Sequence, residues 1–107
     1  MIYHIKVEFK VKNYKVYLTL IKEIDLPFHP NKGDQIVVDD IFCRINEVTF
    51  FIDDGFSLLD ADEDCTRYAK SKDEAIKHLV SEFKELRPYG WTMEDFNLGN
   101  IKDLDKV

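Results

Sequence analysis

The chain has 107 residues, 45% of them hydrophobic and 34% charged, with a formal net charge of −6. This balance predicts one folded domain spanning residues 1–107 and excludes a disordered chain. No apolar run approaches the roughly 18 to 20 residues that a membrane span needs, and the N-terminus lacks the continuous apolar block of a signal peptide. We therefore expect a cytoplasmic protein without a membrane partner, too acidic to wrap duplex nucleic acid.

The charge is unevenly distributed along the chain. Residues 1–22 hold five lysines against one glutamate, whereas residues 34–64 hold ten acidic residues against one arginine. A local basic face near the N-terminus therefore remains compatible with the acidic total.

Residues 1–25 predict an antiparallel β-hairpin. Apolar and polar residues alternate from Tyr3 to Lys12, which is typical of a strand buried on one face. Asn13-Tyr14 predicts the turn, since asparagine tolerates left-handed backbone. The second strand, residues 15–24, is apolar on both faces, so we expect it to lie in the interior of the sheet.

Residues 26–69 predict a set of bent hairpins. Pro27 and Pro30 interrupt the sheet because proline lacks the N–H that a strand ladder needs. Gly33-Asp34 then predicts a turn into a short strand, residues 35–38, and Asp39-Asp40 predicts a tight turn into a long strand.

The long strand, residues 41–52, changes phase once. Its apolar residues occupy odd positions before Asn46-Glu47 and even positions after it: Ile41, Cys43 and Ile45, then Val48, Phe50 and Ile52. A one-residue bulge would keep both halves facing the core and would bend the strand. Such a bend favours a sheet that curls towards a barrel.

Asp53-Asp54-Gly55 predicts the next hairpin turn, with Asp-Gly supplying the positive φ of a type I′ turn. A fifth strand begins at Phe56. Whether it continues through the acidic run at residues 60–64 is left open.

Residues 71–87 predict the one well-defined helix, which covers about residues 72–87. Ser71 and Glu74 form a capping box ahead of an apolar stripe at helical spacing. Pro88 and Gly90 end the helix. In the tail, residues 88–107, a second cap beginning at Thr92 suggests a short helix, followed by a charged end that frays.

These elements predict an α+β fold, with about five mostly antiparallel strands in a curved sheet or partly open small barrel and one C-terminal helix. The stretch from Leu26 to Ile52 resembles the entry of Src-homology-3-like small barrels, such as KOW and Tudor domains. The residues that carry the resemblance are Pro30, Gly33, Asp34, Ile36, Ile45 and Val48. The chain as a whole resembles small bacterial or phage proteins without an established activity, so the resemblance implies no site residue.

The acidic run contains weak candidates for a metal site. Asp60, Asp62 and Asp64 match the first, third and fifth positions of an EF-hand loop. Cys65 stands where that loop needs glycine, and Ser71 stands where it needs glutamate. We therefore favour a solvated acidic turn and expect no metal or other cofactor.

No residue is predicted to be catalytic. The three histidines lack zinc-site spacing, and the two cysteines, Cys43 and Cys65, are expected to be buried and unbridged. A metal-dependent protein or small enzyme is the least favoured hypothesis.

Two surfaces are candidate interaction sites. Lys6, Lys10, Lys12 and Tyr17 would give the first hairpin a basic face with an aromatic neighbour, as in modules that bind single-stranded nucleic acid. The favoured alternative is a solvated sheet face. Tyr89 and Trp91 could anchor a partner, although packing of Trp91 over the sheet is favoured.

The leading functional prediction is a non-catalytic cytoplasmic interaction or accessory module that binds another macromolecule, with an unidentified protein as the favoured partner. Single-stranded nucleic acid is the alternative. The oligomeric state is left open, because an unpaired edge strand could dimerise.

Overall fold

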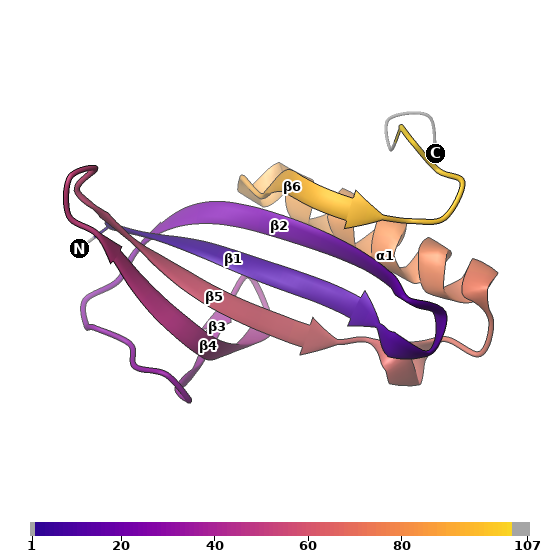
Figure 1. Ribbon diagram of the computed structural model, residues 1–107, viewed down its shortest axis with the longest axis horizontal. Coiled ribbons are helices and arrows are strands. Elements are labelled where there is room, and N and C mark those ends of the chain that lie inside the picture. Colours follow the sequence, from indigo (N-terminus) through magenta and orange to yellow (C-terminus); the bar gives the residue numbers. More distant parts are fainter. Residues whose placement is uncertain (1, 104–107) are drawn as a thin grey trace.

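A computed structural model describes residues 2–103. It contains one six-stranded mixed sheet and one α-helix (Figure 1). The strands are β1 (Ile2–Val11), β2 (Val16–Asp25), β3 (Gln35–Val38), β4 (Ile41–Phe51), β5 (Phe56–Asp64) and β6 (Thr92–Asn97), and the helix is α1 (Lys72–Leu86). Short 3₁₀ turns follow β1, β5 and α1 at Lys12–Tyr14, Thr66–Tyr68 and Arg87–Tyr89. The α+β class with a C-terminal helix is confirmed.

The strands are ordered β3-β4-β5-β1-β2-β6. The predicted β1–β2 hairpin is confirmed, and β2 lies between β1 and β6, as its two apolar faces indicate. The five-strand, mostly antiparallel arrangement was only approximate. There is a sixth strand, and β5 pairs with β1 in parallel, from Tyr3 opposite Ser57 to Lys10 opposite Asp64. The acidic run therefore belongs to β5, beside the lysine-bearing strand.

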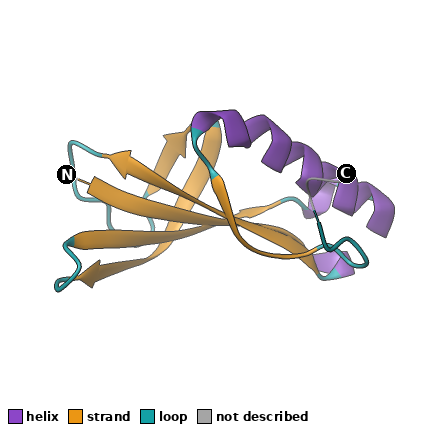
Figure 2. Cartoon of the chain, turned by 90° about the horizontal axis from the view of Figure 1, so that it is seen from above, coloured by secondary structure: helices purple, strands orange, loops and turns teal. Residues whose placement is uncertain are grey.

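The core lies on the face of the sheet that carries the odd-numbered residues of β1. Tyr3, Ile5, Val7, Phe9 and Val11 are all fully buried there. Helix α1 packs on this face with Ala75, Leu79 and Phe83. Figure 2 shows α1 across one end of the sheet, away from the β4–β5 hairpin. We call this the inner face and the opposite, helix-free side the outer face.

Ser71 begins α1 as predicted, but the second half of its capping box is displaced by one residue. The Ser71 hydroxyl accepts a hydrogen bond from the Glu74 N–H at 3.1 Å. The Glu74 carboxylate accepts from the N–H of Lys70, at 2.8 Å, instead of from that of Ser71. The helix ends at Leu86, because Pro88 lies in the 3₁₀ turn that follows.

Replacing Ser71 with alanine is expected to lower the free energy of unfolding by about 1 kcal/mol, because the Glu74 N–H loses its acceptor. Urea denaturation followed by circular dichroism measures the change. Ser81→Ala, at an exposed position inside the same helix, is the matched control and should alter stability by about 0.5 kcal/mol or less. Equal effects of the two substitutions would contradict the capping role.

The short helix predicted from Thr92 is wrong, because this segment forms strand β6. It pairs antiparallel with β2, with a bulge between Thr19 and Leu20. Met93 and Phe96 pack against the core from this strand. The free edge of β2 thus supplies backbone partners that outweigh a local cap. The predicted fraying of the charged end falls partly on residues 104–107, which lie outside the described part of the chain.

Two predicted turns differ in detail. The residue in left-handed conformation after β1 is Lys15, with φ of 55°, and not Asn13. The β4–β5 hairpin has a four-residue loop between the paired residues Phe51 and Phe56. Only Gly55 has positive φ in that loop, at 72°, so it is not a type I′ turn. The Asp39-Asp40 turn is confirmed, with φ of 50° and 66°.

The bulge in β4 is confirmed, and beyond it Val48 packs against the core opposite Leu59, whereas Phe50 and Ile52 are not buried. The register against β5 shifts between Ile45 and Glu47. Beyond it, Phe50 is 61% exposed and Ile52, at the start of the loop, is 88% exposed, because α1 does not reach this end. The sheet is not closed into a barrel, and β3 and β6 remain its two edges.

Candidate functional site

The outer face of the sheet divides into a charged half and an apolar half. Even-numbered residues of β1 and β5 lie on this face, since the odd-numbered residues of β1, and Ser57, Leu59 and Ala61 of β5, are buried on the opposite face. Lys10 and Asp62 lie towards the α1 end, whereas His4 and Phe56 lie towards the β4–β5 hairpin. The two halves differ in what their side chains offer a ligand.

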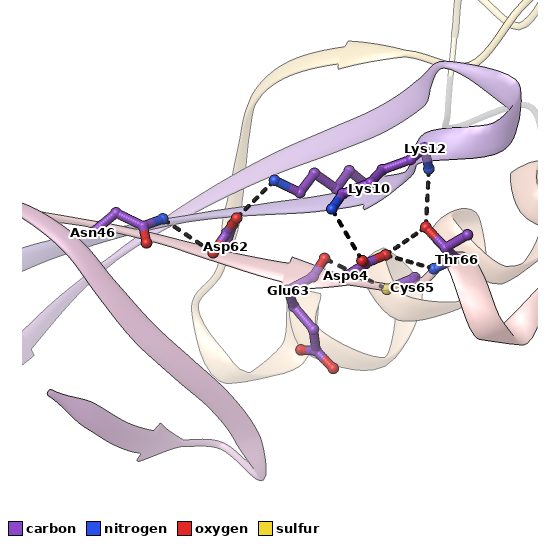
Figure 3. A network of polar contacts seen from close by, with 8 residues as sticks. All are labelled: Lys10, Lys12, Asn46, Asp62, Glu63, Asp64, Cys65 and Thr66. Carbon is purple, nitrogen blue, oxygen red and sulfur yellow. Dashed lines mark hydrogen bonds and ion pairs between the residues drawn. The ribbon is translucent and has the colours of Figure 1, made fainter. Parts of the chain in front are cut away.

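The charged half is a network of ion pairs between β1 and β5 (Figure 3). Lys10 Nζ lies 2.7 Å from Asp62 Oδ2, and the other Asp62 oxygen accepts a hydrogen bond from Asn46 Nδ2 at 3.0 Å. Two residues further along each segment, Lys12 Nζ lies 3.4 Å from Asp64 Oδ2. The residues predicted to form a basic face are therefore neutralised by the acidic run.

The network shifts the pKa values of its members. The hydrogen bond to Asp62 raises the pKa of Lys10. Partial burial acts to raise the pKa of Asp62, but hydrogen bonds from Lys10 and Asn46 lower it overall. The hydroxyl and the N–H of Thr66 hold the pKa of Asp64 at about 2. All three groups are therefore charged at neutral pH.

The stability contributed by Asp64 is expected to vanish in acid. Its pKa falls from an ordinary 3.8 to about 2 on folding, so its ionised form stabilises the native state at pH above about 4. That contribution is lost as the pH falls from about 4 to about 2. The free energy of unfolding, measured by urea denaturation and plotted against pH, should therefore converge for the unsubstituted protein and Asp64→Asn over this range. Asp53→Asn, in the exposed β4–β5 loop, serves as the control. A difference in unfolding free energy between the unsubstituted protein and Asp64→Asn that does not change with pH would contradict the role of Asp64 ionisation.

The remaining residues of the predicted basic face are also engaged. Lys6 Nζ lies 3.1 Å from Glu94 Oε1, and the Tyr17 hydroxyl donates to Asp95 Oδ2 at 3.0 Å. Both acceptors belong to β6, the strand that the sequence did not predict. The face therefore presents paired charges instead of free cations.

The weak metal candidates do not form an EF-hand-like loop. Asp60, Asp62 and Asp64 occupy alternate positions of the extended strand β5, and a 3₁₀ turn follows. Within residues 2–103, no group of three or more histidine, cysteine, aspartate or glutamate side chains is arranged to hold a metal ion.

The apolar half of the outer face, here called the aromatic patch, lies at the opposite end. Its rings are stacked: the His4 and Phe56 centroids are 4.5 Å apart with planes at 17°, and those of Phe56 and Phe51 are 4.9 Å apart at 23°. The patch consists of Ile2, His4, Phe51, Phe56 and Leu58, and Ile52 follows Phe51 at the start of the exposed loop. Ile2 is 45% exposed and Ile52 is 88% exposed.

Acidic residues surround the aromatic patch. Glu23 and Asp25 of β2 lie opposite His4 and Ile2, respectively. Asp53 and Asp54 lie in the exposed loop beside Ile52. An apolar centre within a charged rim is the arrangement typical of a protein–protein contact surface.

Of the two predicted aromatic anchors, only Tyr89 is exposed. Trp91 is buried, and its Nε1 donates to Asp39 Oδ2 at 2.8 Å, in agreement with the packing alternative. Tyr89 lies in a shallow pocket shared with Asp40 and Leu86, on the inner side of the sheet. Neither residue joins the aromatic patch.

The cysteines lie in an environment that suppresses thiolate chemistry. Burial raises the pKa of both Cys43 and Cys65 to about 12, so each is a neutral thiol at physiological pH. Burial also raises the pKa values of Glu63 and Glu82, and the charge of Glu82 contributes to the shift at Glu63. His78 stacks on Tyr68 with ring centroids 4.9 Å apart, and its Nε2 lies 3.7 Å from Glu82 Oε1, beyond hydrogen-bond distance.

The aromatic patch was not predicted from the sequence. Phe51 and Phe56 are paired across the four-residue loop, whereas the predicted two-residue turn at Asp54-Gly55 would have paired Asp53 with Phe56. The outward direction was missed because only the even positions after the bulge, Val48, Phe50 and Ile52, were assigned to a face, and Phe51 was left unassigned.

In the described part of the chain, no helix is both long and apolar enough to cross a bilayer. Comparisons with protein-family models, with curated proteins and with solved structures found no match.

Proposed function

We propose that this protein is a non-catalytic interaction module that binds a protein partner through the aromatic patch. The observation that carries the proposal is the stack of His4, Phe56 and Phe51 on the outer face, which no helix or strand among residues 2–103 covers. Stacked rings are held in place before binding, so little side-chain entropy would be lost in the complex. Aromatic side chains also dominate the energetics of many protein interfaces.

The rim indicates the chemistry of the partner. Glu23, Asp53 and Asp54 place negative charge around the apolar centre, and the nearest lysine of β1, Lys6, is already paired with Glu94. A partner with an apolar centre and basic flanks would complement this surface and would be steered towards it. The same rim repels a phosphate backbone, so the aromatic patch does not favour the alternative of single-stranded nucleic acid.

The charged half of the outer face gives that alternative little support either. Binding of nucleic acid gains affinity by releasing counterions from phosphates, which requires free cations. Lys6, Lys10 and Lys12 are instead held by carboxylates of β5 and β6. Single-stranded nucleic-acid binding and the Src-homology-3-like resemblance both stay predictions.

Replacing the exposed residues Phe51 and Ile52 with serine is expected to weaken partner binding by about thirtyfold or more, the loss typical of interface anchors. A photocrosslinking amino acid at Asp54, beside the patch, would first capture the partner in cells. Titration of the purified partner would then measure the affinity.

The matched control is a second exposed apolar pair on the same sheet. Val37 and Phe42 lie opposite each other on β3 and β4, and are 57% and 62% exposed. Val37→Ser with Phe42→Ser should leave the affinity unchanged. Equal losses from both double variants, or none from Phe51→Ser with Ile52→Ser, would rule out the aromatic patch as the contact surface.

A further inference from the structure

A second surface feature lies on the opposite side of the molecule from the aromatic patch. It is a groove of about 810 Å³ between α1 and the segment that follows β6. Gly99 of that segment sits close to the helix, where an added Cβ would lie 3.4 Å from Lys72 Cε and 3.6 Å from Ile76 Cδ1. The groove therefore follows the exposed side of α1 from its first turn.

The groove combines an apolar base with a basic rim. Its apolar lining comes from Ile76, Val80, Leu98 and Ile101. Along the helix the rim carries Lys72, Lys77 and Lys84, against Asp73 and Glu85. Within residues 2–103, the ammonium groups of Lys72 and Lys77 have no hydrogen-bond or ion-pair partner, unlike those of Lys10, Lys12 and Lys22. Two free cations thus border an apolar base.

We propose that this groove binds a small amphipathic anion, an aliphatic chain that ends in a carboxylate. The volume falls within the range of about 300 to 1,000 Å³ typical of small-molecule sites. The chain would lie on Ile76 and Ile101, and the carboxylate would be held by Lys72 or Lys77. From Lys72 to Lys84 the helix rises by about 18 Å, enough for an extended chain.

The groove shares no residue with the aromatic patch, so this proposal stands or falls independently of the proposed function. Serine at Phe51 and Ile52 should leave binding in the groove unchanged. Reversing the charge of Lys72 and Lys77 should likewise leave binding of the protein partner unchanged.

Calorimetric titration of the full chain with sodium decanoate, below its micelle concentration, tests the proposal. We expect one saturable site. Decyltrimethylammonium, which keeps the chain and reverses the charge, should bind about tenfold more weakly, because an attraction between its head group and the lysine rim is replaced by a repulsion. Sodium acetate, which keeps only the carboxylate, should show no saturable binding. Equal binding of decanoate and decyltrimethylammonium would overturn the assignment.

Variants locate the site. Lys72→Glu with Lys77→Glu should weaken decanoate binding by about tenfold. Lys15→Glu with Lys32→Glu makes the same change of charge at exposed positions elsewhere and should have no effect. Ile76→Trp should abolish binding by filling the groove, with circular dichroism reporting whether the helix is intact. Unchanged affinity in Lys72→Glu with Lys77→Glu would overturn the proposal.

Sedimentation with anionic phospholipid vesicles separates a free amphiphile from a lipid surface as the source of the ligand. We expect decanoate to bind and the vesicles to leave the protein in the supernatant. Retention on vesicles without decanoate binding would overturn the proposal.

Discussion

Replacing Trp91 with alanine is expected to lower the free energy of unfolding by about 3–5 kcal/mol, the largest effect of any single substitution that we predict. Trp91 is only 1% exposed, so truncation would leave a large cavity in the core. It would also remove the hydrogen bond from Trp91 Nε1 to Asp39 Oδ2, 2.8 Å long. Urea denaturation should be followed by circular dichroism, because Trp91 is the one tryptophan of the chain and its replacement removes the tryptophan fluorescence signal.

Two controls separate packing from the hydrogen bond. Trp91→Phe keeps most of the ring volume, and Asp39 keeps its contact with Lys22 Nζ at 2.6 Å, so we expect a smaller loss of about 1–3 kcal/mol. Tyr89→Ala, two residues away at a position 61% exposed, should change stability by about 0.5 kcal/mol or less. A loss below about 1 kcal/mol in Trp91→Ala would show that Trp91 does not anchor the core.

The position of Trp91 explains how an open sheet encloses a core. Asp39 lies in the turn between β3 and β4, Lys22 lies in β2, and Trp91 immediately precedes β6. These elements come from opposite ends of the strand order, yet one Asp39 oxygen contacts both Lys22 and Trp91. The twist of the sheet therefore brings the β3–β4 turn close to β2 and to the start of β6. Side chains make this contact, and β3 does not pair with β6.

Local signals in the sequence predicted the local parts of the fold. The alternation from Tyr3 to Lys12 placed β1 and its buried face, and the Ser71 cap placed the start of α1. The phase change at Asn46-Glu47 placed the bulge. Each of these features depends on residues close together in the chain, where side-chain periodicity and backbone preference act directly.

The pairing of β5 with β1 depends on residues more than 50 positions apart, and alternation within a strand does not specify a neighbour. The charge distribution did contain a usable signal. A lysine-bearing strand and an acidic strand would stabilise each other side by side, as Lys10 with Asp62 and Lys12 with Asp64 show. We predicted separate basic and acidic surfaces, whereas the fold places the two runs together.

The candidate contact surface was the least predictable feature. A phenylalanine on the buried face and one on the exposed face look alike in an apolar stretch, and the difference depends on which side of the sheet each residue occupies. Phe9 is fully buried on the inner face, whereas Phe51, paired with Phe56 on the outer face, is 38% exposed. The side of the sheet on which the core forms therefore decides which aromatic residues are left for a partner.

Leu58 and Leu59 offer the sharpest test of this division between the two faces. They are adjacent residues of the same type on β5, opposite His4 and Ile5 of the parallel neighbour β1. Leu59 is fully buried on the inner face, whereas Leu58 lies partly exposed on the outer face, beside the stacked rings. The same truncation at the two positions therefore probes the core and the aromatic patch separately.

Leu59→Ala is expected to lower the free energy of unfolding by about 2–5 kcal/mol, because the cavity would lie among buried side chains of β1 and β4. Leu58→Ala should cost less than half as much, since solvent already reaches that side chain. Leu58→Ala should instead weaken binding of the protein partner. Leu59→Ala, if still folded, should leave that binding unchanged. Equal losses of stability would mean that β5 does not present Leu58 and Leu59 to opposite faces, and the aromatic patch would then lose its structural basis.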